Sequence, residues 1–206
     1  MLSSNLGVYD FICNNIWRQY RDRKTLTTSD AHSKRIDKRE ANEAQLVSLY
    51  DEYYDKIAHY AYARIRDKTE AEDIASEVFL RALQSLKKYE ERGIPMQAWL
   101  FKIAHNLVAD HLRKVPKYEM APIETVEIKD EADPRSSAET NIELQRVAEA
   151  MMQLTEEQSQ VVKLRFFGEL TAREIGGILN KSEGAVREMQ RAALEKLRRL
   201  LDTGEE

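Results

Sequence analysis

The sequence predicts an all-α protein made of two small helical domains joined by a flexible, acidic, proline-containing linker. Glycine and proline are scarce, at 7 and 4 of 206 residues, whereas sandwiches and barrels need many turns rich in these residues. Two blocks of the chain repeat apolar residues with the 3.6-residue period of a helix. Between them, Pro116, Pro122 and Pro134 lie in an acidic stretch with little periodicity, which is typical of an extended tether.

These patterns divide the chain into four segments. We expect an N-terminal extension over residues 1–42, a helical domain over 43–114, a linker over 115–139 and a domain containing a helix-turn-helix over 140–206. The extension has one amphipathic face followed by a polar stretch from Arg21 to Glu40. A docking helix, a regulatory arm and a disordered leader remain open for it. The residues of that face are Val8, Tyr9, Ile12, Ile16 and Tyr20.

The first domain is predicted to contain three or four helices, of which three can be placed. The first runs from about Glu43 to Arg66 with apolar residues on one stripe. A second begins at Thr69, in a capping box with Glu72, and continues to Lys88. After the breaker Gly93-Ile94-Pro95, a third runs from about Met96 to Lys114.

The second domain carries three successive cap signals. A helix over residues 141–153 is followed by one capped by Thr155 and ending near Gly168. Thr171-x-x-Glu174 is a further capping box, with Leu170 and Ile175 as a hydrophobic staple. The chain caps again at Ser182, so two short helices joined by a tight turn predict a helix-turn-helix.

The helix after Ser182 separates arginines from apolar residues. Arg187, Arg191 and Arg198 lie about 100–140° around the helix from Val186, which starts the apolar side. A recognition helix needs this arrangement, because an arginine in the major groove can bind guanine through two hydrogen bonds or hold a phosphate. Gly184 would permit close approach, Ser182 would bond a phosphate, and Gln190 would read adenine or support the core edge.

The helix from Met96 carries a second polar strip. Lys102, Asn106 and Arg113 gather on one side, with His105 at its margin. A cationic strip behind a Gly-Pro loop suits a single nucleic-acid strand with an unstacked base. A third surface lies on the preceding helix, where Asp73, Glu77 and Leu80 form an acidic and apolar stripe suited to a basic partner.

Composition restricts the function classes. The net charge is −4 and no segment is basic overall, so any nucleic-acid surface is a local stripe. The single Cys13 excludes an internal disulfide and fits a reducing cytosol. No apolar run reaches the ~18 residues of a membrane span, and no catalytic or metal-ligand motif is present. We expect a cytoplasmic protein that is not an enzyme and has no cofactor or metal.

Three stretches resemble the sigma-70 family of bacterial transcription initiation factors. AEDIASEVFLRALQSL is similar to the polymerase-binding region 2.2, and QAWLFKIAHNLVADHLRK to the promoter-melting regions 2.3–2.4. LTAREIGGILNKSEGAVREMQRAALEKLRRLL resembles the region 4.2 helix-turn-helix. Two domains without a third between them resemble the extracytoplasmic-function (ECF) group. Relatives carry Thr and a second basic residue where this chain has Ala185 and Met189, so the resemblance assigns no −35 contact to these two positions.

The resemblance implies a role for each surface. The chain would bind core RNA polymerase, through the clamp helices of the largest subunit and the flap of the second-largest, and would bind promoter DNA as duplex and as melted strand. An anti-sigma factor would control it, and it would be associated with the nucleoid. The polymerase would contact Asp73, Glu77 and Leu80. The −10 strand would contact Arg92, Lys102, His105, Asn106 and Arg113. The −35 element would contact Ser182, Gly184, Arg187, Gln190 and Arg191.

Two other functions remain as alternatives. An ordinary helix-turn-helix regulator would bind an operator tightly without polymerase, but it leaves the Lys102, Asn106 and Arg113 strip unexplained. A sigma-like decoy that occupies anti-sigma factors needs no arginine stripe, so the stripe counts against it.

Overall fold

The computed structural model describes residues 30–89, 94–114 and 145–202, and within these ranges the chain is entirely helical apart from the short connections between helices. The predicted N-terminal face, the linker and Arg92 lie outside these residues. The all-α prediction is confirmed. The elements are α2 (Asp30–Ile65), α3 (Lys68–Ser85), the 3₁₀ turn η1 (Leu86–Lys88), α4 (Met96–Lys114), a helical stretch at 145–152, α6 (Glu156–Gly168), α7 (Ala172–Leu179) and α8 (Glu183–Asp202).

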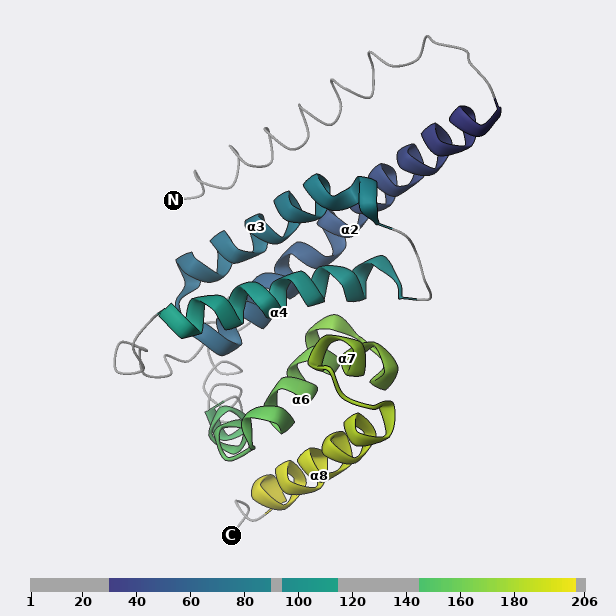
Figure 1. Cartoon of the computed structure of the whole chain (residues 1–206). Helices are drawn as coiled ribbons and strands as arrows, with labels where there is room; N and C mark the ends of the chain where they lie inside the picture. The colour runs from purple at the N-terminus through teal and green to yellow at the C-terminus, as the bar shows by residue number, and fades with distance from the viewer. Residues whose placement is uncertain (1–29, 90–93, 115–144, 203–206) are drawn as a thin grey trace, which may run out of the picture.

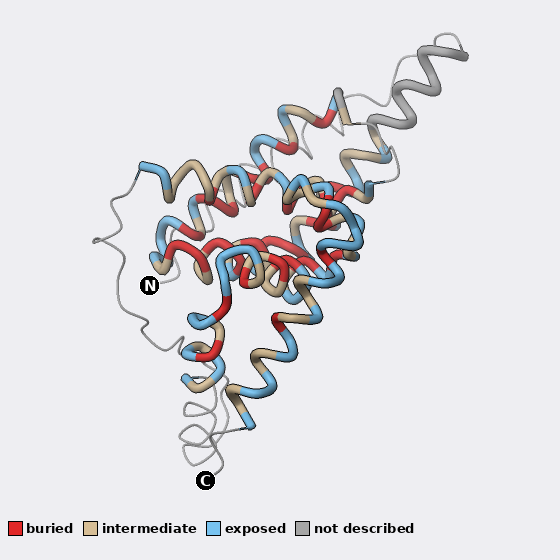
Figure 2. The backbone as a smooth tube through the Cα atoms, turned by 60° about the horizontal axis from the view of Figure 1, so that its bottom comes forward, coloured by how far each residue is buried: buried red, intermediate tan, exposed pale blue. Residues whose placement is uncertain are grey.

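Helices α2, α3 and α4 pack on one another and form the first group of helices (Figure 1). The predicted apolar stripes point inward, since Ile57, Ala61, Val78, Ala82 and the other core residues are almost fully buried. Figure 2 shows buried residues on the sides of helices that face one another and exposed residues on the outer sides. The group therefore presents the polar faces of α3 and α4 outward.

Two predicted helix starts in the first group are wrong. α2 begins at Asp30, within the segment predicted as an extension, rather than at Glu43. α3 is capped by Asp67 and not by Thr69, because the Asp67 carboxylate accepts a hydrogen bond from the Glu70 N–H at 3.0 Å. Arg66 takes a left-handed φ of 60°. That conformation ends α2 and leaves Asp67 in position to cap the next helix.

The second group consists of α6, α7 and α8, and its cap predictions are confirmed. Thr155 with Gln158 and Thr171 with Glu174 each form both hydrogen bonds of a capping box. Leu170, next to the second box, is 1% exposed. α8 packs on both α6 and α7, and Val186 and Ala193 are its buried residues.

The two groups are in contact. α6 packs on α2 and α4, and α7 packs on α4. The buried residues of both groups form one continuous hydrophobic cluster, which includes Phe101 of α4 and Leu170 before α7. In Figure 1 the second group lies against α4, with α8 on the far side.

Candidate nucleic-acid interfaces

The turn between α7 and α8 is fixed by backbone geometry and two side-chain caps. Asn180 takes a left-handed conformation with φ 55°, the role often filled by glycine in such turns. The Lys181 N–H then bonds to the Gly176 carbonyl at 2.9 Å. Ser182 Oγ accepts from the Ala185 N–H at 3.2 Å and so caps α8. These bonds set the direction in which α8 leaves the turn.

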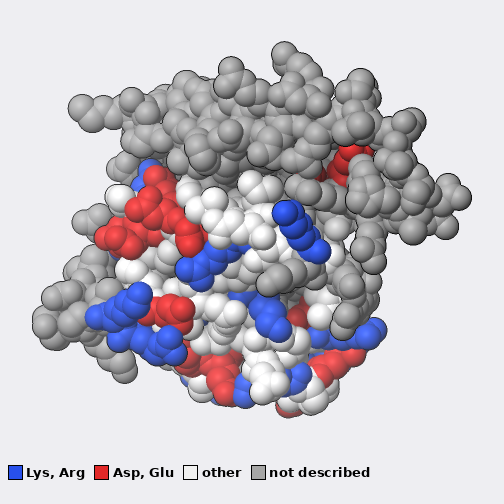
Figure 3. Space-filling model, turned by 45° about the horizontal axis from the view of Figure 1, so that its top comes forward, with Lys and Arg blue, Asp and Glu red and all other residues white. Residues whose placement is uncertain are grey.

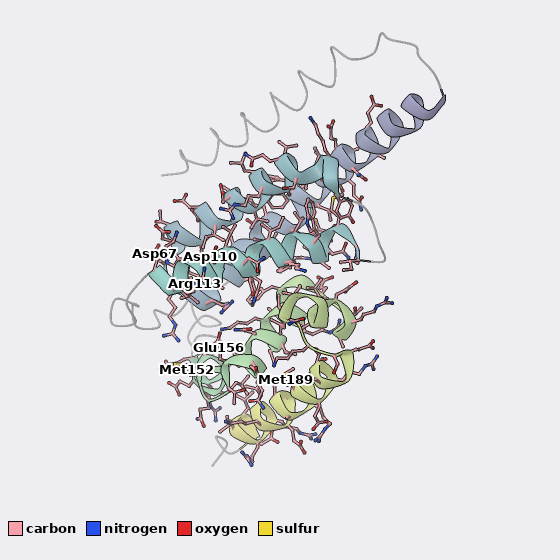
Figure 4. The ribbon with its side chains drawn as sticks, viewed as in Figure 1. Asp67, Asp110, Arg113, Met152, Glu156 and Met189 are labelled. Atoms are coloured by element: carbon pink, nitrogen blue, oxygen red, sulfur yellow. The ribbon has the colours of Figure 1, made fainter. Side chains whose placement is uncertain are left out.

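The exposed side of α8 is the side predicted from its periodicity. Ser182, Gly184, Arg187 and Arg191 are exposed, whereas Gln190 is half-buried. Met189 lies on the side toward α6 and packs partly on the core (Figure 4). Gly184 has open space around the position that a Cβ would occupy. The structure therefore brings four of the five predicted −35 residues to one accessible surface.

The arginines on this surface are held by neighbouring carboxylates. Arg187 pairs with Glu183 at 2.6 Å, one turn earlier. Arg191 pairs with Glu188 at 2.7 Å and with Glu195 at 2.9 Å. The carboxylates raise the pKa of Arg191, and the Arg191 guanidinium lowers the pKa of Glu188. Such exposed pairs are individually weak, so an anionic ligand could replace them at little cost.

The strip on α4 is only partly assembled as predicted. Lys102, Asn106 and Arg113 are exposed, and Arg113 pairs with Asp110 at 2.6 Å near the end of α4 (Figure 4). His105 does not join them. Its Nδ1 lies 3.1 Å from the Tyr60 hydroxyl, on the side of α4 that faces α2.

Two aromatic residues hold the ends of the loop before α4. The rings of Tyr89 and Trp99 are 4.8 Å apart. The Tyr89 hydroxyl donates to the Ile94 carbonyl at 3.3 Å. The chain that leaves η1 is therefore attached to the start of α4, beside the exposed strip.

The acidic stripe on α3 is accessible. Asp73 and Leu80 are exposed, and Glu77 is half-buried and paired with Arg81 at 2.6 Å. Figure 3 shows basic and acidic side chains side by side on the face it displays, and not one large field of a single sign. Each predicted interface is thus a local surface.

Sequence reasoning missed a polar cluster between the two groups of helices. Arg64 Nη2 bonds to Glu156 Oε1 at 3.0 Å, although 92 residues separate them. The Arg64 side chain is 6% exposed, and its Nη1 also lies 3.4 Å from His105 Nδ1. Burial and the nearby Arg64 charge lower the pKa of His105 to about 4. No local pattern marks these residues, because Arg64 and His105 meet only where α2 packs on α4, and Glu156 joins them only where the two groups pack together.

The same cluster holds a second cation. Burial, together with the nearby charges of Arg64 and Arg66, lowers the pKa of Lys163 to about 8 against the opposing effect of Glu156. Arg64 is therefore not the only cation that Glu156 has to balance where the groups meet.

Among the described residues, no helix combines the length and the apolar character that a membrane span requires.

Family sequence profiles match both groups of helices. Residues 49–116 match Sigma-70 region 2, and residues 150–199 match Sigma-70, region 4. The ECF RNA polymerase sigma factor BldN of Streptomyces coelicolor is 34% identical over 169 residues, which cover 81% of this chain and 64% of BldN. The chain thus spans slightly less than two thirds of BldN. SigD of Mycobacterium tuberculosis strain H37Rv is 32% identical over 69% of this chain and 70% of SigD.

Solved structures share the fold. CnrH, in complex with the cytosolic domain of CnrY, matches with a TM-score of 0.58 and 22% identity over 82% of this chain and 95% of CnrH. The sigma factor RpoE, in complex with the anti-sigma factor NepR from Bartonella quintana, matches with a TM-score of 0.59 and 18% identity over 77% of this chain and 97% of that one.

Proposed function

The chain belongs to the ECF sigma factors of the sigma-70 family, and from this premise we propose that it brings core RNA polymerase to promoters and helps to melt them. One observation carries the proposal most directly. A capped helix-turn-helix presents Arg187 and Arg191 outward, in the same chain as an exposed polar strip on α4. An initiation factor needs one surface for duplex DNA and another for the melted strand.

The surface on α8 is proposed to read the −35 element. Arg187 and Arg191 would exchange their carboxylate partners for guanine edges or phosphates in the major groove. Ser182 and the first turn of α8 would hold a phosphate. Because Glu183, Glu188 and Glu195 remain close by, the arginines are arranged for positioning, with modest sequence readout.

The strip on α4 is proposed to hold the −10 strand. Lys102 and Arg113 are exposed cations for phosphates, and Asn106 is an exposed amide for a base edge. Tyr89 and Trp99 fix the base of the adjoining loop, which contains Arg92. His105 contributes to this surface only indirectly as long as it faces Tyr60.

The polymerase is proposed to bind the stripe of Asp73, Glu77 and Leu80 on α3. Two carboxylates beside an exposed leucine suit a basic helix with an apolar residue at its centre. Its position on α3 leaves the α4 strip and α8 available for DNA in the same complex. The protein would act in the bacterial cytoplasm, and an anti-sigma factor would restrain it, as NepR is bound to RpoE in the related structure.

In-vitro transcription from a fragmented genomic library tests this function. Core polymerase is assayed alone, with the full chain, and with Arg187→Ala and Arg191→Ala combined. We expect discrete new start sites with the full chain, preceded by a shared pair of sequence elements, and far fewer with the variant. Operator-like DNA binding without core polymerase, combined with no new starts, would instead identify an ordinary regulator.

A further inference from the structure

The outer side of α8 carries a carboxylate as close to its centre as any arginine. At about 100° per residue, Glu188 lies about 200° around the helix from the buried Val186, and Arg191 lies about 140° from it. Glu188 therefore points almost directly away from the core, whereas the next residue, Met189, lies toward α6 (Figure 4). The Glu188 side chain is 66% exposed and that of Arg191 is 63% exposed. A ligand that covers Arg191 thus also meets Glu188.

Small residues leave the surface in front of Glu188 open. A side chain on a helix leans toward the N-terminus, so the Glu188 carboxylate lies over Gly184 and Ala185, one turn earlier. Both residues are exposed, and a Cβ on Gly184 would meet nothing within 4 Å. No large side chain at these two positions separates the carboxylate from the edge of a base in the groove.

The other two carboxylates of this surface are less favourably placed. Glu183 is the first residue of α8, lies only about 60° from Val186 and has a side chain that is 44% exposed. Glu195 lies about two turns beyond Glu188, or ~10 Å further along the helix. It is therefore outside the N-terminal part of a recognition helix, which is the part that contacts base edges.

The present partner of Glu188 is the arginine that DNA would take away. Arg191 Nε donates to Glu188 Oε2 at 3.1 Å, and Arg191 Nη2 donates to Glu188 Oε1 at 2.7 Å. These hydrogen bonds lower the pKa of Glu188, so its carboxyl group is ionised at neutral pH. When Arg191 turns to a guanine or a phosphate, the charge on Glu188 needs another donor, because an ionised group left unpaired against DNA is costly.

The major groove offers few donors to a carboxylate. Guanine presents two acceptors there and thymine presents one, and the phosphates repel a negative charge. Adenine presents its N6 amino group beside the acceptor N7, which also repels a carboxylate. Cytosine presents its N4 amino group with no acceptor beside it. Cytosine is therefore the base that satisfies Glu188 best.

We propose that Glu188 is a specificity-determining residue of the α8 surface, whose carboxylate accepts a hydrogen bond from the N4 amino group of a cytosine close to the base bound by Arg191. This role rests on the proposed function, in which α8 enters the major groove at the −35 element. It adds base discrimination to a surface whose arginines alone provide modest readout.

A promoter library randomised over the −35 element tests this role. Core polymerase transcribes the library with the wild-type chain, with Glu188→Ala or with Glu188→Gln, and sequencing of the transcripts gives the base preference at each position. We expect wild type to prefer cytosine about tenfold at one position, and Glu188→Ala to prefer it less than about twofold there with the other positions unchanged. Glu188→Gln should prefer adenine at that position, because glutamine bonds to both N6 and N7.

Glu195→Ala is the matched control. It removes the other carboxylate that pairs with Arg191, so it makes the same change in charge and also frees this arginine. The cytosine preference should remain at the wild-type value in this variant. If Glu195→Ala and Glu188→Ala lose the preference equally, Glu188 acts only through Arg191 and does not contact the base. Circular dichroism confirms that each variant is folded.

A base analogue tests the contact itself. In one selected promoter the cytosine is replaced by a pyrimidinone base, which lacks the N4 amino group and still pairs with guanine. The replacement should lower start yield about tenfold with wild type and less than about twofold with Glu188→Ala, since the variant has no carboxylate to lose a partner. Equal losses with both proteins would overturn the contact.

Duplex binding separates this role from the proposed function. The same library is incubated with each protein without core polymerase, and the bound duplexes are sequenced. New starts with the same cytosine preference in wild type and in Glu188→Ala would overturn the role of Glu188 and leave the proposed function supported. A cytosine preference among bound duplexes that Glu188→Ala loses, together with no starts from wild type, would count against the proposed function and leave the Glu188 contact supported.

Discussion

Gly176 is the residue on which the turn of the helix-turn-helix depends most closely. A Cβ added there would lie 2.6 Å from the Lys181 carbonyl oxygen, which is backbone and cannot rotate away. The carbonyl of Gly176 also accepts the N–H of Lys181. The neighbouring Gly177 is different, because a Cβ there meets nothing within 4 Å.

Alanine at these two glycines should have opposite effects on stability. We expect Gly176→Ala to lower the free energy of unfolding by about 1–3 kcal/mol through forced displacement of the turn. Gly177→Ala should raise it by about 0.5–1 kcal/mol, because alanine loses less backbone entropy in a helix. Urea unfolding of the full chain measures both. Equal effects would show that the turn does not pack on α7 as described.

His105 makes the stability of the protein depend on pH. The side chains facing it are Tyr60 and Arg64 of α2, and Glu156 of α6 adds a carboxylate nearby. The folded protein lowers the pKa of His105 from its ordinary value of 6.5 to about 4. As pH falls below 6.5 the unfolded chain takes up the proton first, so stability present above pH 6.5 is lost as pH falls toward 4.

The difference between wild type and His105→Gln isolates this effect from the other histidines. Between pH 7.5 and pH 5 we expect the free energy of unfolding of wild type to fall by about 1 kcal/mol more than that of the variant. This is roughly half of what the full pKa shift would give over the same pH range, because the ring is partly exposed and solvent screens it. Urea midpoints at the two pH values provide the test. An equally steep loss in His105→Gln would place the titrating group elsewhere.

At the scale of helices, cap signals predicted α6, α7 and α8 well. Each signal is local: a Thr or Ser side chain bonds a backbone N–H three residues later. The same logic failed at α3, where two cap residues compete. Thr69 fits the sequence pattern, but Asp67 directly follows the left-handed Arg66 and is the residue that caps. A capping pattern identifies a helix start only after the end of the preceding helix is known.

The first turn of α8 provides a prediction about DNA approach. Gly184→Ala should leave stability unchanged or raise it by up to about 1 kcal/mol, since a Cβ there has open space and alanine favours the helix. It should nevertheless weaken transcription from promoters with a −35 element, because in the proposed complex the added methyl group would face the DNA. Start-site yield and thermal unfolding are measured together.

Gly177→Ala is the control for Gly184→Ala, because it makes the same substitution at an equally open position in α7 instead of α8. Transcription by Gly177→Ala should stay at the wild-type level. Unchanged transcription in Gly184→Ala would mean that this turn does not come close to DNA.

At the scale of the whole molecule, sequence periodicity could not predict how the two groups of helices meet. Periodicity shows which side of a helix is buried and not which helix buries it. Leu164, for example, fits the apolar period of α6 whichever neighbouring helix covers it. The ion pair between Arg64 and Glu156 could not be predicted from sequence either, because two charged residues 92 positions apart look like ordinary surface residues. The exposure of Arg187 and Arg191 was predictable because a single helix, α8, contains both residues. The position of His105 was not, because it is decided by contacts with Tyr60 and Arg64 of another helix, α2.

The separation of surfaces over the molecule gives a final prediction. Asp73→Ala with Glu77→Ala should weaken binding to core polymerase, because it removes both carboxylates of an exposed stripe on α3. Arg187→Ala should leave core binding unchanged and reduce promoter-specific starts about tenfold, the effect of losing one good arginine contact. Core binding is measured by fluorescence anisotropy and starts by transcription with saturating holoenzyme. Because α3 and α8 lie on opposite sides of the structure (Figure 1), the two defects should be independent. If either variant loses both activities equally although it is folded, then one surface serves both partners and the assignment of α3 to polymerase is wrong.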